Sequence, residues 1–412
     1  MNSPGNSPGN SLGKPASGTD NRHGRSLSRQ GDANLPRYRR VVIKAGTSVL
    51  TGGFNGDQLD LGVMADLAGQ ISELRRSMSV EILLVSSGAI AAGREALGKD
   101  GNSPQGRNIL NRQVLAALGQ GRLMHHYQQL FAEHQVQVAQ TLLTINDLSD
   151  RQSYLNVRNT LLGLLELGVV PILNENDVVA VDEIGEVFGD NDRLSALVAT
   201  LVDADLLVIL TDIDGLYTSD PRTNPDATLI PLVEQVNSET ESAAGKHLNP
   251  GARGGMPTKI EAARLVTTSG IPMIICDGKA KGAVLRAAQG QPIGTRFQPA
   301  AEKLEARKRW MLSRVKDSGW GEILVDPGAA QALLERNVSL LPAGVKGVKG
   351  EFQRGDILYI TDPDGKHIAC GIANYASSDI SSIKGFRSDR IPDLLGYFYG
   401  QEVVHRNNLV LL

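Results

Sequence analysis

The sequence predicts an α/β protein, in which a mainly parallel sheet is sandwiched by helices and followed by a small β-rich domain. Two observations predict the first part. Five short runs are almost wholly apolar, as in strands that are covered on both faces, and helical patterns separate them. The runs are Val41–Lys44, Ile82–Ser87, Val169–Leu173, Leu206–Thr211 and Ile271–Cys276. A third observation predicts the second part, because after Phe297 the chain changes to short strands and turns.

Apolar residues recur at helical spacing between the predicted strands. One stripe consists of Leu59, Val63, Leu67, Ile71 and Leu74, and another consists of Leu194, Leu197, Val198 and Leu201. Each stripe predicts one helix that packs against the sheet. The alternation of strand and helix is typical of βαβ units with parallel strands.

Changes in composition divide the chain into four parts. Residues 1–36 are rich in Ser, Gly, Asn and Pro, and we expect a disordered tail there. The first folded domain is predicted at 37–297, a charged linker at 298–318 and the β-rich domain at 319–400. In the last part, Asp356–Ile360 and His367–Ala373 flank Asp362-Pro363-Asp364-Gly365, a sequence that predicts a hairpin turn.

The overall composition excludes some classes of protein. A formal net charge of -3 and 4% aromatic residues argue against a surface built wholly to bind nucleic acid. No apolar run has transmembrane length and residues 1–36 contain no apolar signal core, so we expect a cytoplasmic protein. Cys276 and Cys370 lie in apolar runs and are predicted to be buried free thiols. No CxxC motif or Cys/His cluster predicts a zinc site.

Ligands of open α/β sheets bind beyond the carboxyl ends of the strands, so functional residues are expected at these ends. Lys44 ends a buried strand and Gly46 follows it. This lysine either reaches solvent at a strand end or is a cation aimed at phosphate. Ser87-Gly88 joins another strand to a helix, which indicates either a tight turn or an anion site at the helix start.

Two further strand ends are rich in acidic and glycine residues. Asn174–Asp177 and Gly189–Asp192 either cap helices or hold an amino group, Mg²⁺ or the lysines. Thr211-Asp212 ends a strand, and Gly254-Gly255 precedes a predicted helix whose first turn contains Lys259. A cation is unfavourable at that end of the helix dipole, and an anionic ligand would remove the conflict.

These strand ends, in this order, resemble the amino acid kinase family. Within it, they are most similar to the members that phosphorylate the γ-carboxylate of L-glutamate with ATP, giving L-glutamyl 5-phosphate in the first step of proline biosynthesis. The similarity runs from about Arg40 to the C-terminus. The matching segments are Val42–Leu50, Ser87–Glu95, Asn174–Asp177, Gly189–Asp192, Thr211-Asp212, Gly254–Met256 and Thr258-Lys259. Residues 319–400 resemble a PUA domain through Leu340–Val345 and Arg354–Asp356.

The resemblance implies a role for each matching residue. Lys44 and Lys259 would contact the transferring phosphate, and Asp192 would orient both lysines. Glutamate would be bound by Ser87, Asp177 and Asn191. ATP would be bound by Lys44, Thr211, Asp212, Arg253, Gly254, Gly255, Met256, Pro257, Thr258 and Lys259. Two positions depart from the family pattern, with Arg253 in place of the usual Thr and Pro257 in place of the usual Ser.

The implied reaction suits these residue types. A glutamate side chain has a pKa of about 4.3 and is ionised at neutral pH, so no general base is needed. The reaction needs alignment of two anions and stabilisation of charge on the phosphoryl oxygens, which two lysines and Mg²⁺ would supply. The resemblance also implies a homo-oligomer, either dimer or tetramer. It further implies inhibition by proline, for which Leu143–Arg158 is the candidate segment, and hand-off of the product to glutamyl phosphate reductase.

One alternative belongs to a different class of protein. The PUA-like domain and the basic linker are also compatible with an RNA-binding or RNA-modifying protein. A further alternative is that this domain only packs against kinase subunits.

Overall fold

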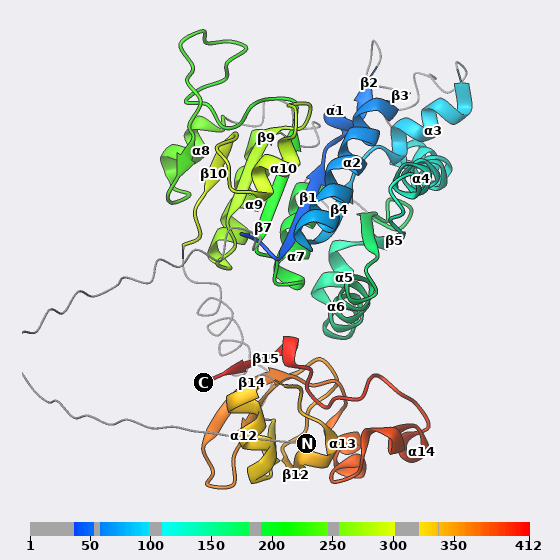
Figure 1. The fold of residues 1–412 in the computed structure, drawn as a ribbon, viewed down its shortest axis with the longest axis vertical. Coiled ribbons are helices and arrows are strands. Elements are labelled where there is room, and N and C mark those ends of the chain that lie inside the picture. Colours follow the sequence, from blue (N-terminus) through cyan, green and yellow to red (C-terminus); the bar gives the residue numbers. More distant parts are fainter. Residues whose placement is uncertain are drawn as a thin grey trace, which may run out of the picture. The chain divides into compact units, whose positions relative to one another are not determined.

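The computed structural model describes residues 37–52, 58–98, 109–180, 191–245, 255–300, 321–336 and 338–412 (Figure 1). The predicted tail, residues 1–36, and most of the predicted linker lie outside these residues. The described residues contain an eight-stranded sheet, a five-stranded sheet and the short pair β2 (Thr51–Gly52) and β3 (Gln58–Leu59). Each of the two large sheets has its own core.

The eight-stranded sheet has the order β5-β6-β4-β1-β7-β9-β10-β8. Its strands are β1 (Arg40–Ala45), β4 (Glu81–Ser86), β5 (Val138–Leu143), β6 (Val170–Glu175), β7 (Leu206–Thr211), β8 (Leu232–Val233), β9 (Met273–Asp277) and β10 (Thr295–Phe297). All pairs are parallel except β9 with β10. The five predicted strands are confirmed, with ends that differ by at most two residues. The sequence analysis missed β5, β8 and β10.

Helices cover both faces of this sheet (Figure 1). They are α1 (Thr47–Leu50), α2 (Leu61–Met78), α3 (Ala89–Leu97), α4 (Ile109–Ala132), α5 (Ile145–Ser149), α6 (Arg151–Glu166), α7 (Asn191–Leu201), α8 (Ser238–Ala243), α9 (Met256–Thr268) and α10 (Ala283–Ala288). Side chains of β1 alternate between the faces. Val41 and Ile43 join the core with α2, α3, α4 and α10, and Val42 joins the core with α6, α7 and α9.

One residue of the predicted helical stripes lies elsewhere. Leu59 belongs to β3, where it pairs with Thr51, and not to α2. The helix begins only after Asp60, whose carboxylate accepts a hydrogen bond from the Val63 amide at 3.1 Å. Aspartate is favoured at the N-cap, so the helix begins after Asp60. The apolar spacing had placed its start two residues too early, at Leu59.

The five-stranded sheet has the order β12-β11-β13-β14-β15. Its strands are β11 (Glu322–Val325), β12 (Val345–Lys349), β13 (Ile357–Thr361), β14 (His367–Ile372) and β15 (Leu409–Leu411). The α12 (Pro327–Arg336), α13 (Ser377–Ile383) and α14 (Ile391–Leu395) helices accompany it, with short 3₁₀ turns η2 (Pro342–Gly344), η3 (Ser388–Arg390) and η4 (Arg406–Asn408). All pairs except β11 with β13 are antiparallel.

The predicted hairpin turn between β13 and β14 is confirmed. The amide of Asp362 donates to the carbonyl of Lys366 at 3.0 Å, and Gly365 has a φ of 84°. A positive φ of this size is readily adopted by glycine, which explains the turn signal in the sequence.

Helix α6 contacts the second sheet. Leu155 is fully buried and packs with Ile357, Cys370, Ile372 and Val410. Arg158 donates to the side chains of Asn408 and Asp203. Both an apolar and a polar contact therefore join α6 to the C-terminal sheet.

Both cysteines are buried and free, as predicted. Burial raises the pKa of Cys276 to about 12, so its thiol is protonated at neutral pH. None of the helices in the described ranges has the length and apolar content that a membrane crossing requires.

Candidate active site

A cavity of about 450 Å³ lies at the carboxyl ends of β1, β4, β6 and β7. These strands are parallel neighbours, so their ends meet at one edge of the sheet, and Ala45 pairs with both Ser86 and Leu210. The predicted site residues that line the cavity are Lys44, Ser87, Asp177, Asn191, Thr211, Asp212, Gly255, Met256 and Lys259. The fold thus brings together residues that are up to 215 positions apart, as 259 minus 44 gives.

Of the predicted residues that the structure describes, three do not line this cavity. Asp192 is fully buried, and Thr258 donates a hydrogen bond to it at 2.9 Å. The ring of Pro257 lines a separate cavity of about 250 Å³, next to Glu261. Arg253 lies outside the described residues, as does Gly254.

A buried carboxylate joins the two predicted lysines. Lys44 Nζ is 2.6 Å from Asp192 Oδ1, and Lys259 Nζ is 3.1 Å from Asp192 Oδ2. The three groups come from the end of β1, the first turn of α7 and the first turn of α9. Both lysine side chains are less than 10% exposed, at 7% and 9%. Two ammonium groups are therefore held side by side in the floor of the cavity.

The electrostatics of this group favour an anionic ligand. Burial raises the pKa of Asp192, but the charges and hydrogen bonds of Lys44 and Lys259 outweigh burial and lower the pKa to about 2. The carboxylate is thus ionised at neutral pH. Because it offsets only one of the two ammonium charges, the group has a net positive charge at the cavity floor.

Three helices begin at the cavity without a side-chain cap. Helices α1, α3 and α9 follow Gly46, Gly88 and Gly255, and none of these three has a side-chain hydrogen bond at its start. Gly88 has a φ of 106° and Gly255 a φ of 137°, a range that favours glycine. Amides at uncapped helix starts are available to bind anions, and the helix dipole adds to this attraction.

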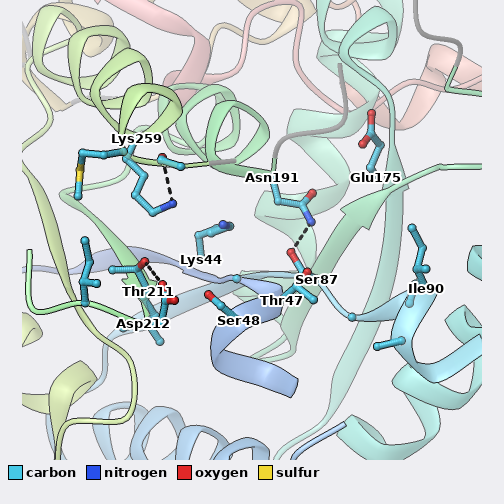
Figure 2. A pocket seen from close by; sticks show the side chains of 18 of the residues that line it. Lys44, Thr47, Ser48, Ser87, Ile90, Glu175, Asn191, Thr211, Asp212 and Lys259 are labelled. Carbon is cyan, nitrogen blue, oxygen red and sulfur yellow. Dashed lines mark hydrogen bonds between the residues drawn. The ribbon is translucent and has the colours of Figure 1, made fainter. Parts of the chain in front are cut away.

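A hydrogen-bonded network lies on the β4–β6 side of the cavity. The side-chain amide of Asn191 donates to Ser87 Oγ at 2.9 Å and to Asn174 Oδ1 at 3.2 Å (Figure 2). Asn174 in turn donates to Gln120 of α4 at 2.8 Å. Among the described residues, Asn191 Oδ1 accepts no hydrogen bond although it is buried. This oxygen is therefore an acceptor that a bound ammonium group would satisfy.

Strand β1 divides the cavity into two halves. Figure 2 shows Lys44 between Thr211, Asp212 and Lys259 on one side and Ser87, Asn191 and Glu175 on the other. The strand order β6-β4-β1-β7 produces this arrangement. A ligand in each half would meet the other beside Lys44, which is the geometry that transfer between two bound molecules needs.

Three residues that line the cavity were missed by the sequence analysis: Arg112, Asp220 and Arg222. Thr47, Ser48 and Ile90 also line it, and they lie in the matching segments but were given no role. Arg222 pairs with Asp220 at 3.1 Å. Neither arginine follows a predicted strand directly, so the search at strand ends could not find them. Glu175 also lines the cavity, and it lies in the acidic segment that the sequence analysis had singled out.

Comparisons with known proteins identify both parts of the chain. The model of the amino acid kinase family matches residues 39–277, and that of the PUA domain matches residues 321–395. Glutamate 5-kinase of Dehalococcoides mccartyi strain CBDB1 is 54% identical over 376 residues, which cover 91% of this chain and 99% of the relative. Glutamate 5-kinase of Herpetosiphon aurantiacus is 52% identical, with 90% and 98% covered. Glutamate 5-kinase of Deinococcus radiodurans is 48% identical, with 90% and 100% covered.

These matches and the two sheets confirm the predicted fold class, a mainly parallel sheet between helices followed by a β-rich PUA domain. The chain belongs to the amino acid kinase family.

Proposed function

We propose that this chain transfers the γ-phosphoryl group of ATP to the γ-carboxylate of L-glutamate, giving L-glutamyl 5-phosphate and ADP in the first step of proline biosynthesis. One observation carries the proposal. The buried Asp192 holds Lys259 together with Lys44, and Lys44 lies between the two halves of the cavity. The names of relatives that cover nearly the whole chain support the choice of glutamate as acceptor.

The chemistry follows from the charges. An ionised carboxylate oxygen of the acceptor attacks the γ-phosphorus, the bond from phosphorus to the bridging oxygen breaks, and ADP leaves with that bond's electron pair. No proton has to move, because the acceptor is ionised at neutral pH. Lys44, Lys259 and the amides at the starts of α1 and α9 stabilise the charge on the phosphoryl oxygens and reduce the repulsion between the two anionic substrates.

The two halves of the cavity suggest which residues hold each substrate. Ser87, Asp177 and Asn191 lie on the β4–β6 side and bind glutamate. ATP is bound on the β7 side by Thr211, Asp212, Gly255 and the first turn of α9. Pro257 contributes by starting that helix rather than through its ring, which faces the separate cavity.

The residues of the site fit Mg²⁺ as part of the nucleotide complex. Among the described residues, no group of three or more His, Cys, Asp or Glu is arranged to hold a metal ion. Mg²⁺ commonly binds through substrate phosphates and one or two carboxylates. Asp212 lines the nucleotide half and is the carboxylate best placed to assist. The ion would neutralise phosphate charge alongside the lysines.

A hydroxylamine trap tests the proposal. An acyl phosphate reacts with hydroxylamine to give a hydroxamate, which is detected by its coloured iron complex. We expect hydroxamate with L-glutamate and ATP. In a parallel assay of ADP release, we expect far less ADP with aspartate, acetylglutamate or UMP as acceptor. A folded protein that gives no hydroxamate with glutamate would contradict the proposal.

The surface of α4 supports assembly into a homo-oligomer. Leu110, Val114 and Leu118 are 62%, 48% and 45% exposed, and their spacing of four residues places them on one side of the helix. Exposed apolar stripes of this kind mark protein interfaces. We expect light scattering to show a dimer or tetramer and Val114→Glu to weaken it. A monomeric wild-type protein would contradict this assignment.

Regulation and product transfer complete the proposal. Leu143 pairs with Glu175 across β5 and β6, so the Leu143–Arg158 segment begins next to the acceptor half of the cavity. This position supports inhibition by proline that competes with glutamate, and steady-state inhibition kinetics will test it. The labile acyl phosphate requires prompt reduction in the cytoplasm, which supports hand-off to glutamyl phosphate reductase.

A specific surface supports RNA binding by the PUA domain as a second function. Phe386, Tyr397, Phe398 and Tyr399 are between 41% and 50% exposed. The guanidinium of Arg354 lies 4.2 Å from the centre of the Tyr399 ring. Exposed rings beside cations are typical of single-strand binding. We expect salt-dependent binding of a labelled single-stranded RNA, weakened by Phe398→Ala. Binding that is unaffected by salt and by this substitution would leave packing as the domain's role.

A further inference from the structure

The proposed acceptor carries a second carboxylate, attached to its α-carbon, and this group also needs a partner. Four cationic side chains line the described part of the cavity. They are Lys44, Arg112, Arg222 and Lys259. The position of Arg112 within the cavity decides which substrate it can reach.

Close packing of two helices fixes the position of Arg112. A Cβ atom added to Gly93 of α3 would lie 2.0 Å from the Leu115 carbonyl oxygen, and one added to Gly119 of α4 would lie 1.8 Å from that of Ala89. Only glycine allows the two backbones to approach this closely. The first half of α4 is thereby held against the start of α3, which borders the acceptor half of the cavity.

Side-chain hydrogen bonds also hold α4 beside the acceptor half of the cavity. Gln113 donates to the carbonyl oxygen of Val178 at 3.3 Å, immediately after Asp177. Gln120 accepts from Asn174, which is bonded to Asn191. Because Arg112 and Gln120 are eight residues apart, they lie on one side of the helix. Arg112 is therefore in the half of the cavity that contains Asp177 and Asn191, and not in the nucleotide half.

We infer that Arg112 binds the α-carboxylate of the acceptor and thereby selects an α-amino acid. A guanidinium offers two parallel N–H groups that match a carboxylate, which makes arginine suited to this task. The ammonium group of the same acceptor then meets Asn191 Oδ1 and Asp177. The γ-carboxylate is directed toward Lys44. This assignment rests on the proposed function and adds the residue that recognises the far end of the substrate.

The test compares two acceptors in two proteins. L-Glutamate and 4-aminobutanoate both carry the reacting carboxylate and an amino group, but only glutamate has the α-carboxylate. We expect Arg112→Gln to lower kcat/KM for glutamate by about 10- to 100-fold, as for loss of a hydrogen bond to a charged group. We expect no change in kcat/KM for 4-aminobutanoate. If 4-aminobutanoate reacts too slowly for its rate to be measured, its inhibition constant in competition with glutamate is compared between wild type and Arg112→Gln instead.

A control variant and a stability measurement distinguish a binding role of Arg112 from a structural role. Arg122→Gln removes the same charge from an exposed position of the same helix and should leave both acceptors unaffected. A merely structural role for Arg112 would lower the rates of both acceptors equally and lower the melting temperature, which would overturn the inference. Unchanged glutamate kinetics in Arg112→Gln would also overturn it. Failure of the wild-type protein to phosphorylate glutamate would instead overturn the proposed function.

Discussion

The two large sheets differ in the direction of their strands, and this difference determines where polar residues gather. In the eight-stranded sheet the central strands are parallel, so the residues after β1, β4, β6 and β7 meet at one edge. In the five-stranded sheet most neighbours are antiparallel, so adjacent strands end at opposite edges. A constellation such as Lys44, Asp192 and Lys259 can therefore form at the first sheet from residues far apart in the sequence.

The two domains also bury polar groups differently. Asp192 is buried against two lysines whose net charge calls for a ligand. In the C-terminal domain the buried Asp356 accepts from the Gln353 amide at 2.8 Å, and the buried Asn374 donates to the Glu402 carbonyl at 3.0 Å. There these two groups bond to the backbone of their own domain. The comparison teaches that the buried carboxylate at the cavity is bound by two cations, which leave a net charge for a ligand, whereas the buried carboxylate of the second domain binds a backbone amide.

The largest effect should come from removing one lysine of the pair. We expect Lys44→Ala to fold and to lose about 10²–10³ in kcat, because one stabilising charge on the phosphoryl group disappears. The matched control is Lys349→Ala, which removes an exposed lysine 3.4 Å from Glu322 in the second sheet. Steady-state assays of ADP release measure both. Activity of Lys44→Ala within a few-fold of wild type would refute its role.

Neutralising the buried carboxylate should affect stability as well as activity. Asp192→Asn leaves two buried ammonium groups without their counter-charge, which commonly costs about 3–5 kcal/mol of unfolding free energy. Asp356→Asn, the control in the other domain, should cost about 1 kcal/mol. Urea unfolding followed by circular dichroism measures both. Equal losses would show that the two buried carboxylates are equivalent.

The lowered pKa of Asp192 predicts a pH dependence. Because its folded-state pKa is about 2 and its ordinary value is 3.8, the ion pairs stabilise the fold fully above that ordinary value. This contribution, on the order of 2 kcal/mol, is lost as the pH falls toward 2. Unfolding free energies of wild type and Asp192→Asn should converge over that range. Parallel curves would contradict the assignment.

The smallest effect should come from a glycine beside the pair. A Cβ added at Gly46 would lie 3.2 Å from Lys44 Nζ, so Gly46→Ala should displace the ammonium slightly and lower kcat by about tenfold. The backbone tolerates alanine there, because its φ is -75°. Gly163→Ala is the control, since nothing lies within 4 Å of its added Cβ. Equal kcat values for the two variants would contradict this prediction.

The sequence predicted most of the first sheet because its central strands are buried on both faces. It missed β5 because that strand is only partly buried and lacks a continuous apolar run. The proximity of Lys44 to Lys259 was implied by the family resemblance, and the unfavourable position of Lys259 at a helix start indicated an anionic ligand there. Arg112 was missed because its approach to the cavity depends on the tertiary contact between Gly93 and Leu115, which no local pattern encodes.

The backbone contact between α3 and α4 has a consequence for communication between subunits. One side of α4 contains Arg112 at the cavity, and the helix also presents the exposed stripe of Leu110, Val114 and Leu118. With no side chain at Gly93 to absorb a displacement, a shift of α4 must carry α3 with it. If subunits meet through the stripe, assembly and acceptor affinity are thermodynamically linked. Glutamate binding would then raise the affinity between subunits by the same factor by which assembly raises the affinity for glutamate.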